Sequence, residues 1–127
     1  MLTLPGTVRI YLAAEPVDLR RGFDGLAAAT REIIRQDPLS GHLFVFRNRR
    51  SNRLKILLWE PSGYLLIYKR LERGRFRVPW SPRPGTRHVE LEATELALVM
   101  EGIDLGGARR RERWRPGEKV LARAASI

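Results

Sequence analysis

The sequence predicts an α+β fold: a curved antiparallel sheet of four to five strands, one long helix packed on a face, and a short C-terminal helix. Two observations support this prediction. Short runs of β-branched and aromatic residues are separated by turn residues, and two segments have apolar residues at helical spacing. The 127 residues, 43% apolar and 30% charged, suit one globular domain. We expect it to span residues 1–105, with a basic, flexible C-terminal tail over residues 106–127.

The N-terminal part predicts a strand followed by the long helix. The sequence TVRIYLA at residues 7–13 is typical of a short strand, because β-branched and aromatic side chains dominate it. Over residues 19–36 apolar residues recur at helical spacing, and Asp18 is a suitable N-cap. Pro38 and Gly41 then end the helix and turn the chain.

Three strands are predicted next, at about 42–47, 53–60 and 64–71. Between the last two, the sequence Glu-Pro-Ser-Gly-Tyr of residues 60–64 is typical of a three-residue hairpin loop with a bulge at the glycine. If Glu60 faces Tyr64, one face of the hairpin should cover the long helix; its residues are Leu54, Ile56, Leu58, Leu66 and Tyr68.

The same register sets Lys55 directly opposite Lys69. Like charges across a strand pair destabilise it by roughly 0.2–1 kcal/mol. Either a carboxylate from elsewhere compensates the two lysines, or the pair is presented to an anionic ligand.

The last part of the predicted domain holds one strand and one helix. A short strand is expected near residues 88–91, and a helix over residues 94–101 follows, with Thr94 as its N-cap. Gly102 is expected to stop that helix.

Positive charge is the main functional signal. The chain carries a net charge of +10 with a pI near 11.3, and residues 47–77 hold ten Lys or Arg against two glutamates, a net +8. So much charge on a sheet favours contact with a polyanion, although edge cations also serve simply to prevent aggregation. The candidate nucleic-acid-binding residues are Arg47, Arg49, Arg50, Arg53, Lys55, Lys69, Arg70, Arg73, Arg75 and Arg77.

Two further features could add to this surface. Trp59 is a candidate for stacking on nucleic-acid bases, because the predicted register gives it the same face as Lys55 and Lys69; burial in the core is the alternative. The tail is a second candidate for contact, and its cations are Arg109, Arg110, Arg111, Arg113 and Arg115.

The sequence argues against catalysis, metals and membranes. It has no cysteine, its two histidines are isolated, and its carboxylates form no recognisable catalytic constellation. No apolar run approaches the roughly 18 residues that span a bilayer. The first residues do not have the pattern of a signal peptide. We therefore expect no catalytic residue, metal, cofactor or small-molecule substrate, no membrane contact, and a cytoplasmic location.

Three blocks of the sequence resemble a known family. They are DLRRGFDGL at residues 18–26, DPLSGHLFVFRNRRSNRLKILLWE at residues 37–60 and YKRLERGRF at residues 68–76. In order and spacing they resemble the accessory-protein family, called TnpB, of IS66-type bacterial insertion sequences, which is distinct from the RNA-guided nuclease of the same name. The resemblance covers about residues 8–104, and the main departure is Glu60-Pro61, where the family usually has an aspartate and a small or polar residue.

The resemblance implies a small protein encoded beside a separate DDE-type transposase and needed for efficient transposition. It implies no catalytic residues. The basic positions from Arg47 to Arg75 match the family one by one. We therefore expect a non-catalytic accessory protein that binds DNA, either transposon ends or duplex of any sequence, and supports assembly of the transposase complex. The alternative is a protein-interaction module that docks on the transposase or a sister accessory protein without touching DNA.

Overall fold

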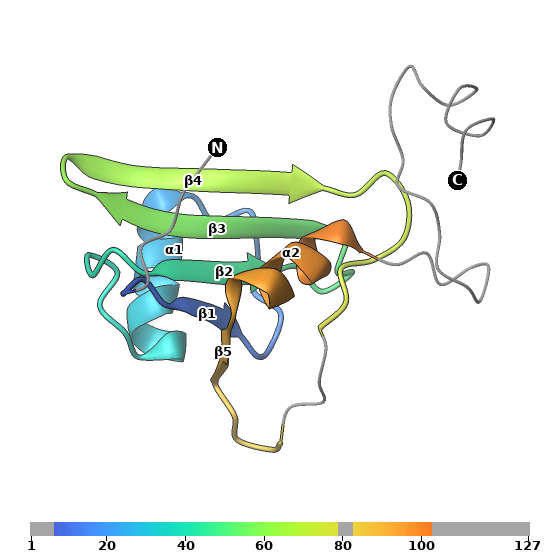
Figure 1. Ribbon diagram of the computed structural model, residues 1–127. Coiled ribbons are helices and arrows are strands. Elements are labelled where there is room, and N and C mark those ends of the chain that lie inside the picture. Colours follow the sequence, from blue (N-terminus) through green and yellow to red (C-terminus); the bar gives the residue numbers. More distant parts are fainter. Residues whose placement is uncertain (1–6, 79–82, 103–127) are drawn as a thin grey trace.

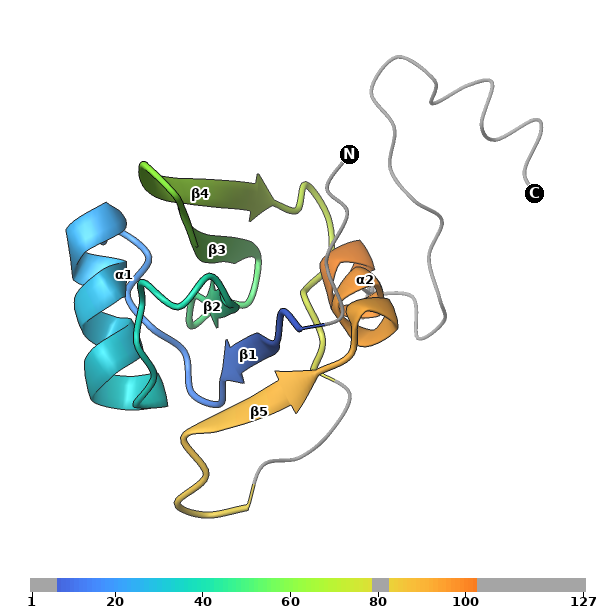
Figure 2. The same cartoon turned by 60° about the vertical axis from the view of Figure 1, so that its left-hand side comes forward.

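The computed structural model describes residues 7–78 and 83–102. Its centre is a five-stranded sheet of order β4-β3-β2-β1-β5 (Figure 1). The strands are Ile10–Ala13 (β1), Leu43–Arg47 (β2), Arg53–Glu60 (β3), Gly63–Arg70 (β4) and His88–Leu91 (β5). One face carries the helix Phe23–Ala29 (α1) with its π-helical continuation Thr30–Ile34 (η1); the other carries Ala93–Glu101 (α2) (Figure 2). The predicted α+β class, with one long and one short helix, is confirmed.

The sheet is mixed, so the prediction of a wholly antiparallel sheet is wrong at one pair of strands. β1 runs parallel to β2, whereas β2–β3, β3–β4 and β1–β5 are antiparallel. Parallel neighbours need a crossover connection. The helix α1 with η1 supplies it, because it lies between β1 and β2 in the chain and covers one face of the sheet (Figure 1).

The long helix starts later than predicted, and Asp18 is not its N-cap. The carboxylate of Asp18 instead accepts hydrogen bonds from the backbone N–H of Arg20 at 3.0 Å and from its guanidinium at 2.8 Å. The helix begins at Phe23 after Gly22, which makes no side-chain cap. It ends in the π-helical turn before Arg35, whose φ of 66° is left-handed.

The β3–β4 hairpin has a two-residue loop instead of the predicted bulged loop. Glu60 pairs with Gly63, and the φ of Gly63 is not positive. Every pair is therefore shifted by one residue from the prediction. Lys55 lies opposite Tyr68 and Lys69 lies opposite Leu54, so the two lysines are on opposite faces of the sheet. The shift removes the predicted repulsion between them.

The shift also corrects the assignment of faces. Alternate residues of β3 divide between two cores, because successive side chains of a strand point to opposite faces. Leu57 packs in the core beneath α1, with Tyr11, Ala13, Leu26, Ile34, Phe44 and Phe46. Of the residues predicted to face the long helix, Leu66 and Tyr68 do lie on the α1 face. Leu54, Ile56 and Leu58 instead lie in the core beneath α2 with Leu12, Val45, Leu71, Phe76, Leu96 and Val99.

The short helix α2 follows β5 directly. Its N-cap is Glu92, not the predicted Thr94, and a reciprocal capping box joins Glu92 to Glu95. The backbone N–H of Glu92 donates to the carboxylate of Glu95 at 2.7 Å. Leu96 and Val99 are buried against the sheet, so the helix closes the second core.

Candidate nucleic-acid interface

The turn between β2 and β3 is built around the side chain of Asn48. Its Oδ1 accepts hydrogen bonds from the backbone N–H of Asn52 at 3.0 Å and of Arg53 at 2.9 Å. Its Nδ2 donates to Oδ1 of Asn52 at 2.8 Å. These bonds hold a compact turn whose tip exposes Arg49 and Arg50. The two arginines therefore project from an ordered backbone.

The segment after β4 is tied to this turn. The N–H of Phe76 donates to the carbonyl of Ser51 at 2.6 Å, and Oγ of Ser51 donates to the carbonyl of Phe76 at 2.7 Å. The N–H of Leu71 donates to the carbonyl of Asn52 at 2.9 Å. Leu71 and Phe76 are both buried beneath α2 and anchor the segment. The two basic stretches, residues 49–50 and 70–77, are thus held side by side.

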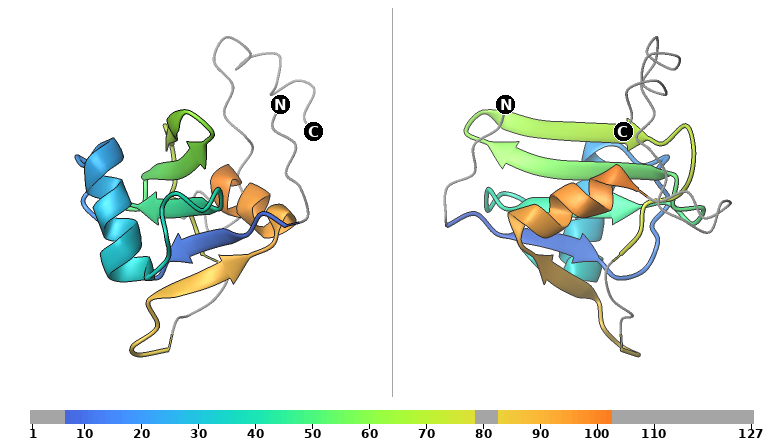
Figure 3. Two further views of the ribbon diagram at one scale, coloured as in Figure 1. Left: turned by 90° about the vertical axis from the view of Figure 1, so that its left-hand side faces the viewer. Right: turned by 45° about the vertical axis from the view of Figure 1, so that its right-hand side comes forward.

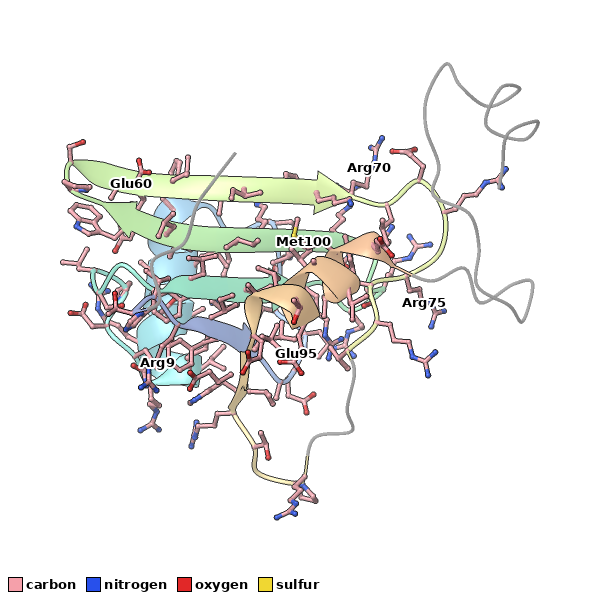
Figure 4. All side chains as sticks on the ribbon, viewed as in Figure 1. Arg9, Glu60, Arg70, Arg75, Glu95 and Met100 are labelled. Carbon is pink, nitrogen blue, oxygen red and sulfur yellow. The ribbon has the colours of Figure 1, made fainter. Side chains whose placement is uncertain are left out.

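Six arginines of these two stretches are exposed at one end of the sheet, and we call them the basic end. They are Arg49, Arg50, Arg70, Arg73, Arg75 and Arg77. Figure 4 shows Arg70 and Arg75 at the end of the sheet opposite Glu60. One carboxylate lies among them: Glu72 forms an ion pair with Arg70 at 2.9 Å, and both side chains are about half exposed. Such an exposed pair contributes little to stability and can exchange partners readily.

The topology brings one more cation, Arg87, to the same end of the sheet. Because β5 is antiparallel to β1, its first residue lies beside Ala13, and Ala14 donates a backbone hydrogen bond to the carbonyl of Arg87. Arg87 is exposed, and sequence reasoning missed it. The signal that could have found it is its position directly before the predicted strand near residues 88–91.

The two predicted lysine contacts are occupied inside the fold. Nζ of Lys55 donates to the carbonyls of Leu19 at 2.7 Å and Arg21 at 2.9 Å, and it lies 4.7 Å from the ring centroid of Tyr68. Only 8% of Lys55 is exposed. Lys69 donates to the carbonyl of Met100 at 2.9 Å and so caps the last turn of α2. Lys55 therefore holds the loop before α1 against the sheet, and Lys69 holds the end of α2 there.

Arg47 and Arg53 lie at the base of the turn and are half-buried. Nη2 of Arg47 donates to the carbonyl of Ala14 at 2.9 Å, and its buried Nε finds no partner among the described residues. Burial lowers the pKa of the Arg47 guanidinium from its ordinary value, and Glu15 partly opposes this shift. Arg53 donates from Nη1 to the hydroxyl of Tyr68. Both guanidinium groups are therefore bonded within the fold, next to the exposed arginines of the basic end.

Trp59 lies away from the basic end. It is near the far end of β3, six residues from Arg53, or about 20 Å along the strand. Its ring makes an edge-to-face contact with Tyr64, with 5.0 Å between centroids. Trp59 shares a face with Lys55 but, contrary to the prediction, not with Lys69. The predicted tail contacts, Arg109, Arg110, Arg111, Arg113 and Arg115, lie outside the described residues.

Within residues 7–78 and 83–102, no group of three or more histidine, aspartate or glutamate side chains is arranged to hold a metal ion. None of the helices there is long and apolar enough to cross a membrane.

The fold and the clustered arginines define a small, strongly basic α+β protein with six exposed arginines gathered at one end of a sheet. A family model described as IS66 Orf2-like protein matches residues 8–110. The chain therefore belongs to the IS66 Orf2-like family, and the predicted resemblance is confirmed. Membership identifies it as an accessory protein associated with an insertion sequence.

Two relatives come from Sinorhizobium fredii. The uncharacterized protein y4jC is 38% identical over 109 residues, which cover 86% of this chain and 91% of that protein. The uncharacterized protein y4hO is 36% identical over 116 residues, 91% of this chain and 96% of that protein. No solved structure matches the chain.

Proposed function

We propose that this protein is a non-catalytic accessory factor of transposition that binds DNA through its basic end. Bound DNA would then lie beside the cognate DDE-type transposase, and a sister accessory protein would complete the assembly. The cell compartment for this role is the cytoplasm, at the nucleoid. The observation that carries the proposal is the gathering of Arg49, Arg50, Arg70, Arg73, Arg75 and Arg77 on two hydrogen-bonded stretches at one end of the sheet.

The scaffold favours phosphate contact. Guanidinium groups bind phosphate through paired hydrogen bonds, and a backbone already fixed by Asn48 and Ser51 loses little entropy on binding. Contacts from loop arginines to phosphates position a protein on duplex DNA without reading sequence. We therefore expect binding to transposon-end DNA and to unrelated duplex with similar affinity when the transposase is absent.

A salt titration with matched variants tests this function. Affinity for a fluorescent duplex, measured by anisotropy, should fall by about 0.9 log units per phosphate contact for each log unit of salt. Changing Arg49 and Arg50 to Ala together should lower that slope by about two. The control changes Arg9 and Arg31 to Ala, which removes the same charge from the far end of β1 and from the helix layer.

The outcomes distinguish three possibilities: direct contact of the basic end with DNA, attraction of DNA by net charge alone, and docking on the transposase. Equal loss in both double variants would contradict the site, because it would show that net charge alone attracts DNA. Absence of duplex binding at moderate salt, with co-purification of the transposase retained, would replace the proposal with protein docking. Loss of co-purification when Arg49, Arg50, Arg73 and Arg75 are all changed to Ala would locate that docking at the basic end.

A further inference from the structure

The outer edge of β4 is open to pairing. β4 is the last strand of the order β4-β3-β2-β1-β5, and no strand of the described residues pairs with its outer side (Figure 3). It is eight residues long, Gly63–Arg70, with no proline and with three consecutive apolar residues at its centre. Natural edge strands are protected by short length, proline, bulges or a central charge. β4 has none of these between Gly63 and Tyr68.

The hairpin register shows which backbone groups point outward. In an antiparallel pair, alternate residues exchange hydrogen bonds with the partner strand. The two-residue loop makes Gly63 a residue that exchanges hydrogen bonds with Glu60 of β3. Eight positions further on, the N–H of Leu71 donates to the carbonyl of Asn52, which follows the same alternation. Odd-numbered residues of β4 therefore bond to β3. The N–H and C=O groups of Tyr64, Leu66 and Tyr68 point away from it, and none of them has a backbone partner among the described residues.

We propose that β4 pairs antiparallel with β4 of a second copy of this chain, around a twofold axis through Leu66. A twofold axis perpendicular to a sheet keeps each side chain on its own face. Two residues that face each other across the axis must therefore both have even numbers or both have odd numbers. Leu66 then faces Leu66 of the second copy, and Tyr64 faces Tyr68. All three outward-pointing residues pair, which gives about six backbone hydrogen bonds between the copies.

The side chains are complementary to themselves in this register. Leu65 lies opposite Ile67 of the second copy on the α2 face, and both are partly buried apolar residues of that core. Tyr64 and Tyr68 meet on the α1 face as a cross-strand aromatic pair. Moving the axis to Ile67 would set Leu65 opposite Lys69, whose ammonium is bonded to α2. The register centred on Leu66 is the better fit.

The charges at the two ends of β4 are also complementary. The cationic end of the strand, at Arg70, comes to lie beside Ser62 and one turn residue away from Glu60 of the second copy. Figure 4 shows that Arg70 and Glu60 lie at opposite ends of the hairpin in one copy, so the antiparallel pairing places each Arg70 between Glu72 of its own copy and Glu60 of the second copy. This self-complementarity favours a second copy as the occupant of the edge.

Single cysteines test the register directly, because the chain has none of its own. Across a hydrogen-bonded antiparallel pair the Cα atoms are about 5.5 Å apart, within the range of about 4.4–6.8 Å that a disulfide spans, and the Cβ atoms must approach by about 1 Å to close the bond. We expect Leu66→Cys to form a disulfide dimer rapidly under mild oxidation. Leu98→Cys is the control, because Leu98 is 62% exposed on α2. A mixture of Tyr64→Cys and Tyr68→Cys chains should give the mixed dimer in preference to either homodimer.

Sedimentation velocity supplies the readout without cross-linking. The unmodified chain should sediment as a dimer, and Leu66→Pro, which removes an outward-pointing N–H together with the packing of Leu66 beneath α1, should shift it to monomer with its circular dichroism retained. A monomer at all concentrations up to about 100 µM would overturn the proposal. So would disulfide formation in Leu66→Cys no faster than in Leu98→Cys. DNA binding enters neither readout, so this inference and the proposed function succeed or fail separately.

Discussion

Replacing Lys55 by methionine tests whether a buried ammonium group holds the loop before α1 onto the sheet. Lys55 donates two hydrogen bonds, to the carbonyls of Leu19 and Arg21, and lies over the ring of Tyr68. Methionine keeps an apolar stem of similar length but donates nothing. Both carbonyls would then lose their partner at a site where only 8% of the side chain is exposed.

The expected loss of stability follows from these contacts. A hydrogen bond from a charged group contributes roughly 1.5–3 kcal/mol, and a cation–π contact about 0.5–1 kcal/mol at a partly exposed ring. Relief from burying the ammonium group offsets part of this sum. We expect the free energy of unfolding to fall by roughly 2–4 kcal/mol. With a urea m-value of about 2 kcal/mol/M, the unfolding midpoint should fall by about 1–2 M.

Arg49→Met is the matched control, because it also exchanges one positive charge for methionine, at an exposed position. Its stability should stay within about 0.5 kcal/mol of the unmodified chain. The two variants should differ in the opposite sense in DNA binding: Arg49→Met lowers the salt slope by about one, and Lys55→Met leaves it unchanged. Equal stability of Lys55→Met and the unmodified chain would refute the structural role, and a lower salt slope for Lys55→Met would restore its predicted contact with DNA.

Two further predictions concern single side chains. Hydrogen bonds from the Arg20 side chain and backbone lower the pKa of Asp18 from 3.8 to about 2. The ionised carboxylate therefore stabilises the fold fully above about pH 4, and this contribution is lost as the pH falls towards 2. In a carboxyl NMR titration, Arg20→Gln should move the Asp18 midpoint back towards 3.8; an unmoved midpoint would contradict the pairing. Asn48→Ala should cost about 1–3 kcal/mol in thermal unfolding and weaken DNA binding, whereas Asn48→Asp, which keeps the acceptor for Asn52, should cost less; equal losses would contradict the role of that acceptor.

The sequence predicted the positions of most elements, because hydrophobic periodicity depends on local residues. Three strands of the meander and the strand at His88–Leu91 lie within a residue or two of their predicted bounds. The parallel pairing of β1 and β2 was missed although the signal was present. A strand, a helix and a strand in succession indicate a crossover, and a crossover joins parallel strands.

The hairpin register could not be read from local turn chemistry. The sequence around Pro61 and Gly63 is compatible with a three-residue bulged loop and with the two-residue loop that forms. The choice depends on packing, because the observed register places Leu57 and Leu66 together beneath α1. A shift of one residue changes which face every side chain occupies. The predicted Lys55–Lys69 pair was lost for this reason.

The sequence predicted only part of the candidate site. A count of cations locates the basic segment but cannot separate exposed arginines from lysines that bind backbone carbonyls. Lys55 stands in the run Leu54–Leu58, where every neighbour is buried. A charge inside such a run indicates a bonded interior group, and this signal was available in the sequence.

The division of charge along the strands gives the described part of the chain an electric dipole. The exposed arginines gather where β2 and β4 end, whereas Glu60 lies at the opposite end of the β3–β4 hairpin (Figure 4). A polyanion exerts a torque on such a dipole at distances of about a Debye length, roughly 8–10 Å at ordinary salt. The protein should therefore rotate before contact and arrive with its arginines leading. The fraction of collisions with DNA that lead to binding should then exceed the fraction of the protein surface that these arginines cover.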